Sequence, residues 1–287
     1  MTSLKNSFAV LAMCLLANAA WAAPRADLWE RWTAHDPASE ISVDHSPWDA
    51  WLKQYVAIDD DGIAKVAYGD VSKQALSALA QYIRDMQSIP VSQLNRDEQS
   101  AFWVNLYNAS TVLLIIQHMP VSTIRDIDIS PGLLSDGPWG RKIVRIEDEE
   151  LSLDDIEHRV LRPIWQDPRI HYAVNCAALG CPNLWPEAMT PSNAEAYLER
   201  GATAFVNHPR GARVEYGRLI VSSIYHWFKE DFGATDAGVI AHLKQYATGD
   251  LADKLKRVSR IDDHQYDWTL NGSGDTAATF KPHRRGS

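Results

Sequence analysis

Hydrophobic residues recur along most of the chain with the three- and four-residue spacings of amphipathic helices. Residues 71–86 and 191–206 each carry such an apolar face, and each stretch predicts a helix packed against a core. Residues 101–116 are apolar nearly all round, which predicts a buried helix at the centre of the fold. The same spacings predict further helices at 47–55, 153–164, 239–246 and 251–258.

Residues 170–176 form an apolar run that ends in a turn of small residues. Neither face of this run carries charge, so it predicts an interior strand with reactive groups at its end. On a regular strand His171 and Cys176 point to opposite faces, because side chains alternate. Only a bulge or twist at Asn175 would bring them together.

The remaining strand signals are short. They lie at 63–68 and 142–146, and in a hairpin of 213–215 and 218–221 around Tyr216-Gly217. The mixture predicts an α/β (α+β) fold in which a small central sheet is packed by helices, with helical additions at both ends.

The N-terminus has the features of a secretory signal: Lys5, an apolar stretch at 8–17, and Ala20-Trp21-Ala22 as an A-x-A-like cleavage site. We therefore expect export to the periplasm. The predicted organisation is a signal peptide at 1–22, an N-terminal helical part at 23–95, a core at 96–235, C-terminal helices at 236–270 and a disordered tail at 271–287.

Composition narrows the function classes. A chain of 287 residues with 46% hydrophobic residues can bury a full core, and a net charge of −9 without a long basic run argues against nucleic-acid binding. The apolar N-terminal run is too short for a stable membrane span. Four of the eleven tryptophans, Trp29, Trp32, Trp48 and Trp51, are expected to clamp an N-terminal helical layer onto the core. The sequence does not identify a protein partner.

Several polar residues fall where apolar ones are expected. Glu157 lies in the middle of the apolar stripe of the predicted helix 153–164, with His158 at its rim, and a carboxylate aimed at a core must be paired or protonated. Asn105 and Asn108 form a polar stripe on the buried helix 101–116, where they either brace neighbouring loops or line a site.

The chain has characteristic blocks of sequence at 101–109, 153–158, 167–171, 175–177, 181–182 and 227–233, and a weaker one at 43–48. Through these blocks it resembles the bacterial branch of the DUF547 family, over about 43–233. The resemblance implies a relation to papain-like thiol hydrolases and their fold.

The sequence departs from the family pattern at two places. His226 stands where the family more often has Lys or Arg, so it is not assigned to catalysis. Asp148-Glu149 replace a glycine turn, which affects a hairpin rather than the site. Within the family the Cys176 position is the steadier of the two cysteines. The Cys181 position can be Ser or Asp in plant relatives, which weakens an obligatory disulfide or zinc site.

The leading hypothesis is nucleophilic catalysis by Cys176, with His158 as the base, Glu157 as the acid of the cluster and His171 as the competing base. It predicts an exported thiol-dependent hydrolase or transferase acting on an amide or thioester bond of a peptide or γ-glutamyl-like small substrate, without a cofactor. Asn105 and Asn108 would orient the base or donate to an oxyanion.

Three alternatives stay open. In a purely structural role Cys176 would be a buried thiol, or joined to Cys181 in a disulfide in an oxidising compartment. His171 would then be a satisfied core histidine, and Glu157 would form a buried ion pair with Arg162 or Arg169. A non-catalytic periplasmic binding module would use the asparagine-lined cleft. A zinc site would draw on the two cysteines with His158 and His171, although the short cysteine spacings of strong zinc sites are absent.

Overall fold

The structure, a computed structural model, describes residues 24–132 and 137–273. The predicted signal peptide at 1–22 and residues 274–287 of the predicted tail lie outside these residues, whereas Asn271 at the start of that tail is buried and donates its N–H to the carbonyl of Ala177. The helices within them are α1 (Ser46–Tyr55), α2 (Lys73–Met86), α3 (Arg96–His118), α4 (Arg162–Trp165), α5 (Ala194–Val206), α6 (Ile224–Trp227), α7 (Asp236–Tyr246) and α8 (Gly249–Leu255). Short helical turns are η1 (Glu30–Thr33), η2 (Tyr68–Asp70), η3 (Val91–Gln93), η4 (Ile124–Asp126), η6 (Pro168–Tyr172) and η7 (Lys229–Phe232), and η5 (Asp155–Leu161) is a π-helix.

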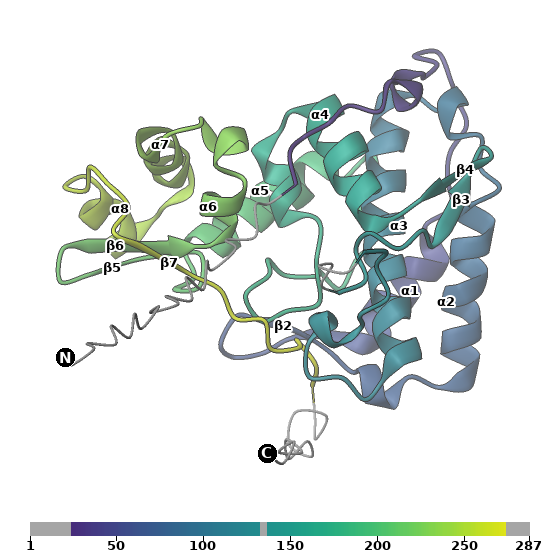
Figure 1. Cartoon of the computed structure of the whole chain (residues 1–287), viewed down its shortest axis with the longest axis horizontal. Helices are drawn as coiled ribbons and strands as arrows, with labels where there is room; N and C mark the ends of the chain where they lie inside the picture. The colour runs from purple at the N-terminus through teal and green to yellow at the C-terminus, as the bar shows by residue number, and fades with distance from the viewer. Residues whose placement is uncertain (1–23, 133–136, 274–287) are drawn as a thin grey trace, which may run out of the picture.

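The elements gather around two hydrophobic clusters. The larger one is built on α1, α2 and α3, on the right of Figure 1. The smaller one lies under α6, α7 and α8, on the left of the same view. Helix α5 joins them, since its Tyr197 packs in the first cluster and its Phe205 in the second.

Helix α3 is the buried central helix that its apolar sequence predicts. Asn95 caps it by accepting a hydrogen bond from the Glu98 backbone N–H, and acidic residues in its first turn suit the positive end of the helix dipole. Trp32 packs edge-on against Trp103 with ring centroids 5.2 Å apart, and Trp48 stacks on Trp51. Trp32 thus packs the N-terminal layer against α3, and Trp48 and Trp51 are buried in the same hydrophobic cluster as α3.

The mixed helix and strand content and the small sheets confirm the predicted fold class. Within the described residues the strands are divided among three small sheets and do not form the one central sheet that was predicted. Strands β1 (Val56–Ile58) and β2 (Ala64–Val66) pair antiparallel, as do β3 (Val144–Ile146) and β4 (Glu149–Leu151); β5 (Ala212–Glu215) and β6 (Arg218–Ser222) form the predicted hairpin, and β7 (Asp263–Gln265) adds parallel to β6.

Acidic residues form the β3–β4 turn, where a glycine turn was expected from the family pattern. Glu147 and Asp148 take φ values of 45° and 70°, the left-handed conformation that a two-residue hairpin loop requires. The departure from the family pattern therefore stays within the hairpin.

The prediction of an interior strand at 170–176 is wrong. Residues 168–172 form the short helix η6, which begins at Pro168 after Asp167 accepts a hydrogen bond from the Arg169 backbone N–H. Pro168 suits a first helical position because its fixed φ matches a helix and its missing N–H would be unpaired there. An uncharged apolar run is equally compatible with a buried helical turn, so period alone could not decide.

The predicted helix 153–164 exists, but its residues Asp155–Leu161 form the π-helix η5. Pro163 has no N–H to donate to the preceding turn. The freed carbonyls find partners in an N-terminal strap, residues 24–29, which runs beside α4 in Figure 1. The backbone N–H of Asp27 donates to the carbonyl of His158, and that of Trp29 to the carbonyl of Arg159.

Candidate functional site

A cavity of about 110 Å³ lies between the two hydrophobic clusters. Five of the residues predicted to form a site line it: Glu157, His158, His171, Cys176 and Cys181. Most of its wall is apolar or aromatic, and the further lining residues are Pro24, Tyr107, Trp139, Asp154, Val174, Pro182, Ile224, Trp227, Phe228, Tyr266 and Trp268.

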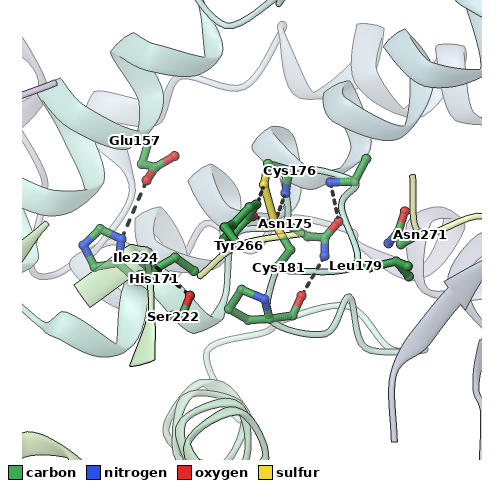
Figure 2. Close-up of a disulfide and its surroundings, with 12 residues drawn as sticks. Glu157, His171, Asn175, Cys176, Leu179, Cys181, Ser222, Ile224, Tyr266 and Asn271 are labelled. Carbon is green, nitrogen blue, oxygen red and sulfur yellow. Dashed lines mark hydrogen bonds and ion pairs between the residues drawn. A yellow bond between two sulfur atoms is a disulfide. The ribbon is translucent and has the colours of Figure 1, made fainter. Parts of the chain in front are cut away.

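Cys176 and Cys181 are joined by a disulfide that closes a six-residue loop on the cavity wall (Figure 2). The side chain of Asn175 stabilises this loop. Its NH₂ group donates to the carbonyl of Pro182 at 2.7 Å, and its oxygen accepts from the N–H of Ala177 at 2.8 Å. Ala177 has a φ of 60°, an uncommon conformation for a residue with a Cβ, and the side chain of Asn175 helps to hold it.

The chain returns to this loop after β7. Backbone hydrogen bonds of 2.8 Å join Leu179 to Thr269 and Gly180 to Asp267. A Cβ at Gly180 would lie 2.8 Å from the Asp267 nitrogen, so only glycine allows this approach. The contact places the Tyr266 hydroxyl 3.0 Å from the Cys176 sulfur and 3.1 Å from the Cys181 sulfur.

Glu157 is 8% exposed and faces the cavity. Its Oε1 lies 3.7 Å from Nδ1 of His171 and 3.8 Å from Nδ1 of His158, and the Tyr107 hydroxyl hydrogen-bonds its carboxyl. Burial raises the pKa of Glu157 to about 7, against the opposing effects of Arg162 and of the Tyr107 hydrogen bond. The burial inferred from the apolar stripe is thus observed.

His171 is held by an ion pair behind it. Its Nε2 lies 2.7 Å from Oδ2 of Asp231, and Arg162 donates to the same oxygen at 2.6 Å. Burial opposes ionisation of Asp231, but the hydrogen bonds from His171 and Arg162 hold its pKa well below the usual range. Burial also lowers the pKa of His171. A neutral His171 therefore carries its proton on Nε2 and presents the Nδ1 lone pair to Glu157.

His158 has the opposite arrangement. Arg162 can only donate, and its Nη1 lies 3.0 Å from Nδ1 of His158, so that nitrogen is already an acceptor. The Nε2 atom faces Asp154 at 3.6 Å. Burial, reinforced by the charge of Arg162, holds the pKa of His158 well below its usual value. Burial raises the pKa of Asp154 to about 6.

The two asparagines do not line the cavity. The amide of Asn105 donates to the carbonyl of Met189 at 2.7 Å and accepts from its N–H at 3.1 Å. The amide of Asn108 donates to the carbonyl of Ala173 and accepts from the N–H of Asn175, both at 2.8 Å. Of the two roles considered for them, these bonds correspond to bracing neighbouring loops.

Other cavity residues were not identified as site residues from the sequence. Tyr107 and Asp231 fall within blocks that resemble DUF547, which is the signal that could have found them. The rings of Tyr266, Trp227 and Trp268 pack against one another at tilted angles, with centroids 4.6–5.6 Å apart. Nothing in the local pattern around Tyr266 predicts its approach to the sulfurs.

In the part of the chain that the structure describes, no group of three or more His, Cys, Asp or Glu side chains is placed to hold a metal ion. Two sulfurs joined in a disulfide also cannot act as thiolate ligands. In the same residues, no helix has the length and apolarity needed to cross a membrane.

Residues 91–206 match the model of a family described as "Protein of unknown function, DUF547". The matched segment includes the cavity residues from Tyr107 to Pro182 and supports the resemblance to that family. No curated protein and no solved structure matches the chain.

Proposed function

We propose that this protein is an exported, periplasmic hydrolase or transferase that uses the thiol of Cys176, in its reduced form, on an amide or thioester bond. The observation that carries the proposal is the cavity itself, which gathers Cys176, Glu157 and two histidines from separate segments around one apolar space. Titratable side chains with perturbed pKa values that line one cavity are typical of active sites.

Glu157 is the group best suited to move protons in this cavity. A pKa of about 7 leaves its carboxyl part-ionised at neutral pH, where a general acid–base works best. His171 would support it as a positioning residue, since Asp231 fixes the tautomer whose Nδ1 faces Glu157. His158 is less suited to be the base, because Arg162 occupies its Nδ1 lone pair.

In the described residues neither histidine hydrogen-bonds a sulfur, so we assign the proton transfers to Glu157. The Glu157 carboxylate takes the thiol proton as the Cys176 sulfur attacks the carbonyl carbon. The carbon–nitrogen or carbon–sulfur bond then breaks, and Glu157 gives that proton to the departing amine or thiol. Water or an acceptor amine attacks the resulting thioester and gives a proton to Glu157. The bond between the acyl carbon and the Cys176 sulfur then breaks, and Glu157 passes that proton to the sulfur, which restores the thiol and the carboxylate.

The lining of the cavity supports a peptide or a γ-glutamyl-like small molecule as the substrate. The carboxyl group of Asp154 suits the α-ammonium group of such a molecule, and the rings of Trp139, Trp227 and Trp268 suit its apolar part. The relation to papain-like thiol hydrolases, and membership of the bacterial branch of DUF547, belong to the same proposal.

The test is covalent labelling of the reduced protein. Wild type and the variants Cys176→Ala, Cys181→Ala and Glu157→Gln are incubated with γ-glutamyl-p-nitroanilide and with an activated thioester, and adducts are mapped by intact and peptide mass. We expect an acyl adduct on Cys176 in wild type and Cys181→Ala and none in Cys176→Ala. Glu157→Gln should slow turnover by about 100-fold or more, as expected for loss of a general acid–base.

Acylation that persists in Cys176→Ala would reject Cys176 as the nucleophile. Reduced wild type that forms no adduct with either substrate would favour the periplasmic binding module instead. Export is tested separately, by sequencing the N-terminus of protein recovered from the periplasm. We expect it to begin near Ala23, and material that still begins at Met1 would contradict the predicted signal peptide.

A further inference from the structure

The Cys176–Cys181 disulfide lines the cavity, and its two sulfurs have different surroundings. Cys176 is partly exposed, whereas Cys181 is 3% exposed. The backbone N–H of Cys176 donates to the Cys181 sulfur at 3.0 Å. In the described residues no backbone N–H donates to the Cys176 sulfur.

A second hydrogen-bond donor, the Tyr266 hydroxyl, contacts both sulfurs of the disulfide. A disulfide sulfur carries no proton, so the Tyr266 hydroxyl is the donor in its contacts of 3.0 Å and 3.1 Å with the two sulfurs. Burial holds the pKa of Tyr266 above its ordinary value, which keeps this hydroxyl protonated. Its single proton can therefore turn toward whichever sulfur gains negative charge.

We infer that the disulfide exchanges with thiols in one direction: an incoming thiolate attacks Cys176, and Cys181 leaves as a thiolate received by the Cys176 N–H and the Tyr266 hydroxyl. This inference rests in part on the proposed function, since it makes reduction the step that frees the nucleophile. Hydrogen-bond donors aimed at a developing anion stabilise it most when they are already in place. Attack on Cys181 would need access to a buried atom and would leave Cys176 with only one of these donors.

The exchange is balanced with two equivalents of a small thiol. The first thiolate bonds to the Cys176 sulfur, the bond between the two protein sulfurs breaks, and the electron pair goes to Cys181, which later takes a proton from water. The second thiolate attacks the bound thiol's sulfur, forms the small-molecule disulfide and releases the thiolate of Cys176. The small thiol is oxidised and the protein disulfide is reduced.

The first experiment uses the wild-type chain and glutathione. Oxidised protein is mixed with excess glutathione, quenched within seconds by an alkylating agent, and the mixed disulfide is mapped by peptide mass. We expect glutathione on Cys176 and the alkyl group on Cys181. Glutathione found first on Cys181 overturns the inference, and this arm needs no variant to fold.

The second experiment measures the reduction rate in Tyr266→Phe. We expect it to fall about tenfold or more, the size expected for losing one hydrogen bond to a charged group. Tyr225→Phe is the matched control, since it removes a buried hydroxyl that hydrogen-bonds Tyr172 instead of the sulfurs. Equal rates in Tyr266→Phe and wild type would contradict the role given to Tyr266.

These measurements separate the inference from the proposed function. Exchange is read with glutathione alone and requires no turnover of an amide or thioester. If glutathione attacks Cys181 while reduced protein still acylates Cys176, only the inference fails. If exchange proceeds through Cys176 and no acyl adduct forms, only the proposed function fails.

Discussion

Replacing Glu157 by glutamine should make the protein more stable at high pH and change its stability much less at low pH. The carboxyl is buried at 8% exposure, and burial raises its pKa from 4.5 to about 7. Between these two values the folded state holds a proton that the unfolded state has released. Stability of the wild type therefore falls as pH rises through this window.

The size of the effect follows from the two pKa values. At 1.36 kcal/mol per pH unit, a pKa near 7 instead of 4.5 corresponds to a cost of about 3 kcal/mol above pH 7. Glutamine cannot ionise, so the free energy of unfolding of Glu157→Gln does not fall in this pH window. Its free energy of unfolding relative to wild type should rise by about 3 kcal/mol between pH 4 and pH 8.

Urea denaturation, followed by tryptophan fluorescence at several pH values between 4 and 8, measures this difference directly. Taking the change with pH, rather than the value at one pH, cancels the fixed cost of placing an amide in the cavity. Tyr107→Phe gives an independent reading: it removes a hydrogen bond that lowers the pKa of Glu157, so the pH window should move upward. A difference between wild type and Glu157→Gln that stays flat from pH 4 to 8 would refute the reasoning and remove Glu157 as a proton carrier at neutral pH.

Two further predictions concern the supports of the disulfide loop. Asn108→Ala and its matched control Asn105→Ala each break two backbone bonds from one buried amide on α3, so each should lose about 2–4 kcal/mol in urea denaturation. Only Asn108→Ala should also change the alkylation rate of reduced Cys176, because Asn108 bonds Ala173 and Asn175 beside it. Equal alkylation rates in the two variants would contradict a role of Asn108 in positioning Cys176. Gly180→Ala should cost about 1–3 kcal/mol by pushing Asp267 away and should slow disulfide reduction, whereas reduction at the wild-type rate would show that the close approach does not position the hydroxyl donor.

The sequence predicts those parts of the fold whose pattern is local. Helix α3 and the β5–β6 hairpin follow from periodicity and from a turn dipeptide, and both are observed. The run at 170–176 failed because its backbone partners are distant in sequence. The amide of Asn108 bonds Ala173 and Asn175 from 65 and 67 residues away, which no local pattern reveals.

Only part of the candidate site could be predicted, because some of its residues are positioned by contacts with residues distant in sequence. Glu157 stands out because a carboxyl interrupts an apolar stripe, and that signal needs no tertiary information. His171 was assigned to the wrong side of Cys176 because a strand was assumed, and the helical turn η6 removes that constraint. Tyr266 reaches the sulfurs from about 90 residues away, through backbone bonds that its own sequence does not encode.

The raised pKa of Glu157 depends on which groups Arg162 hydrogen-bonds. Its guanidinium donates to Asp231, to His158 and to the carbonyl of Pro24, and none of these hydrogen bonds goes to the Glu157 carboxyl. Had it formed a direct ion pair with Glu157, the pKa of that carboxyl would lie in or below its ordinary range and it would carry no proton at neutral pH. Arg162 instead neutralises Asp231, which fixes His171, and leaves Glu157 with hydrogen-bonding but no bonded cation. The N-terminal strap keeps Arg162 and the π-helix η5 in place. The carbonyl of Pro24 accepts a hydrogen bond from Arg162, and the backbone N–H groups of Asp27 and Trp29 donate to the carbonyls of His158 and Arg159 in η5.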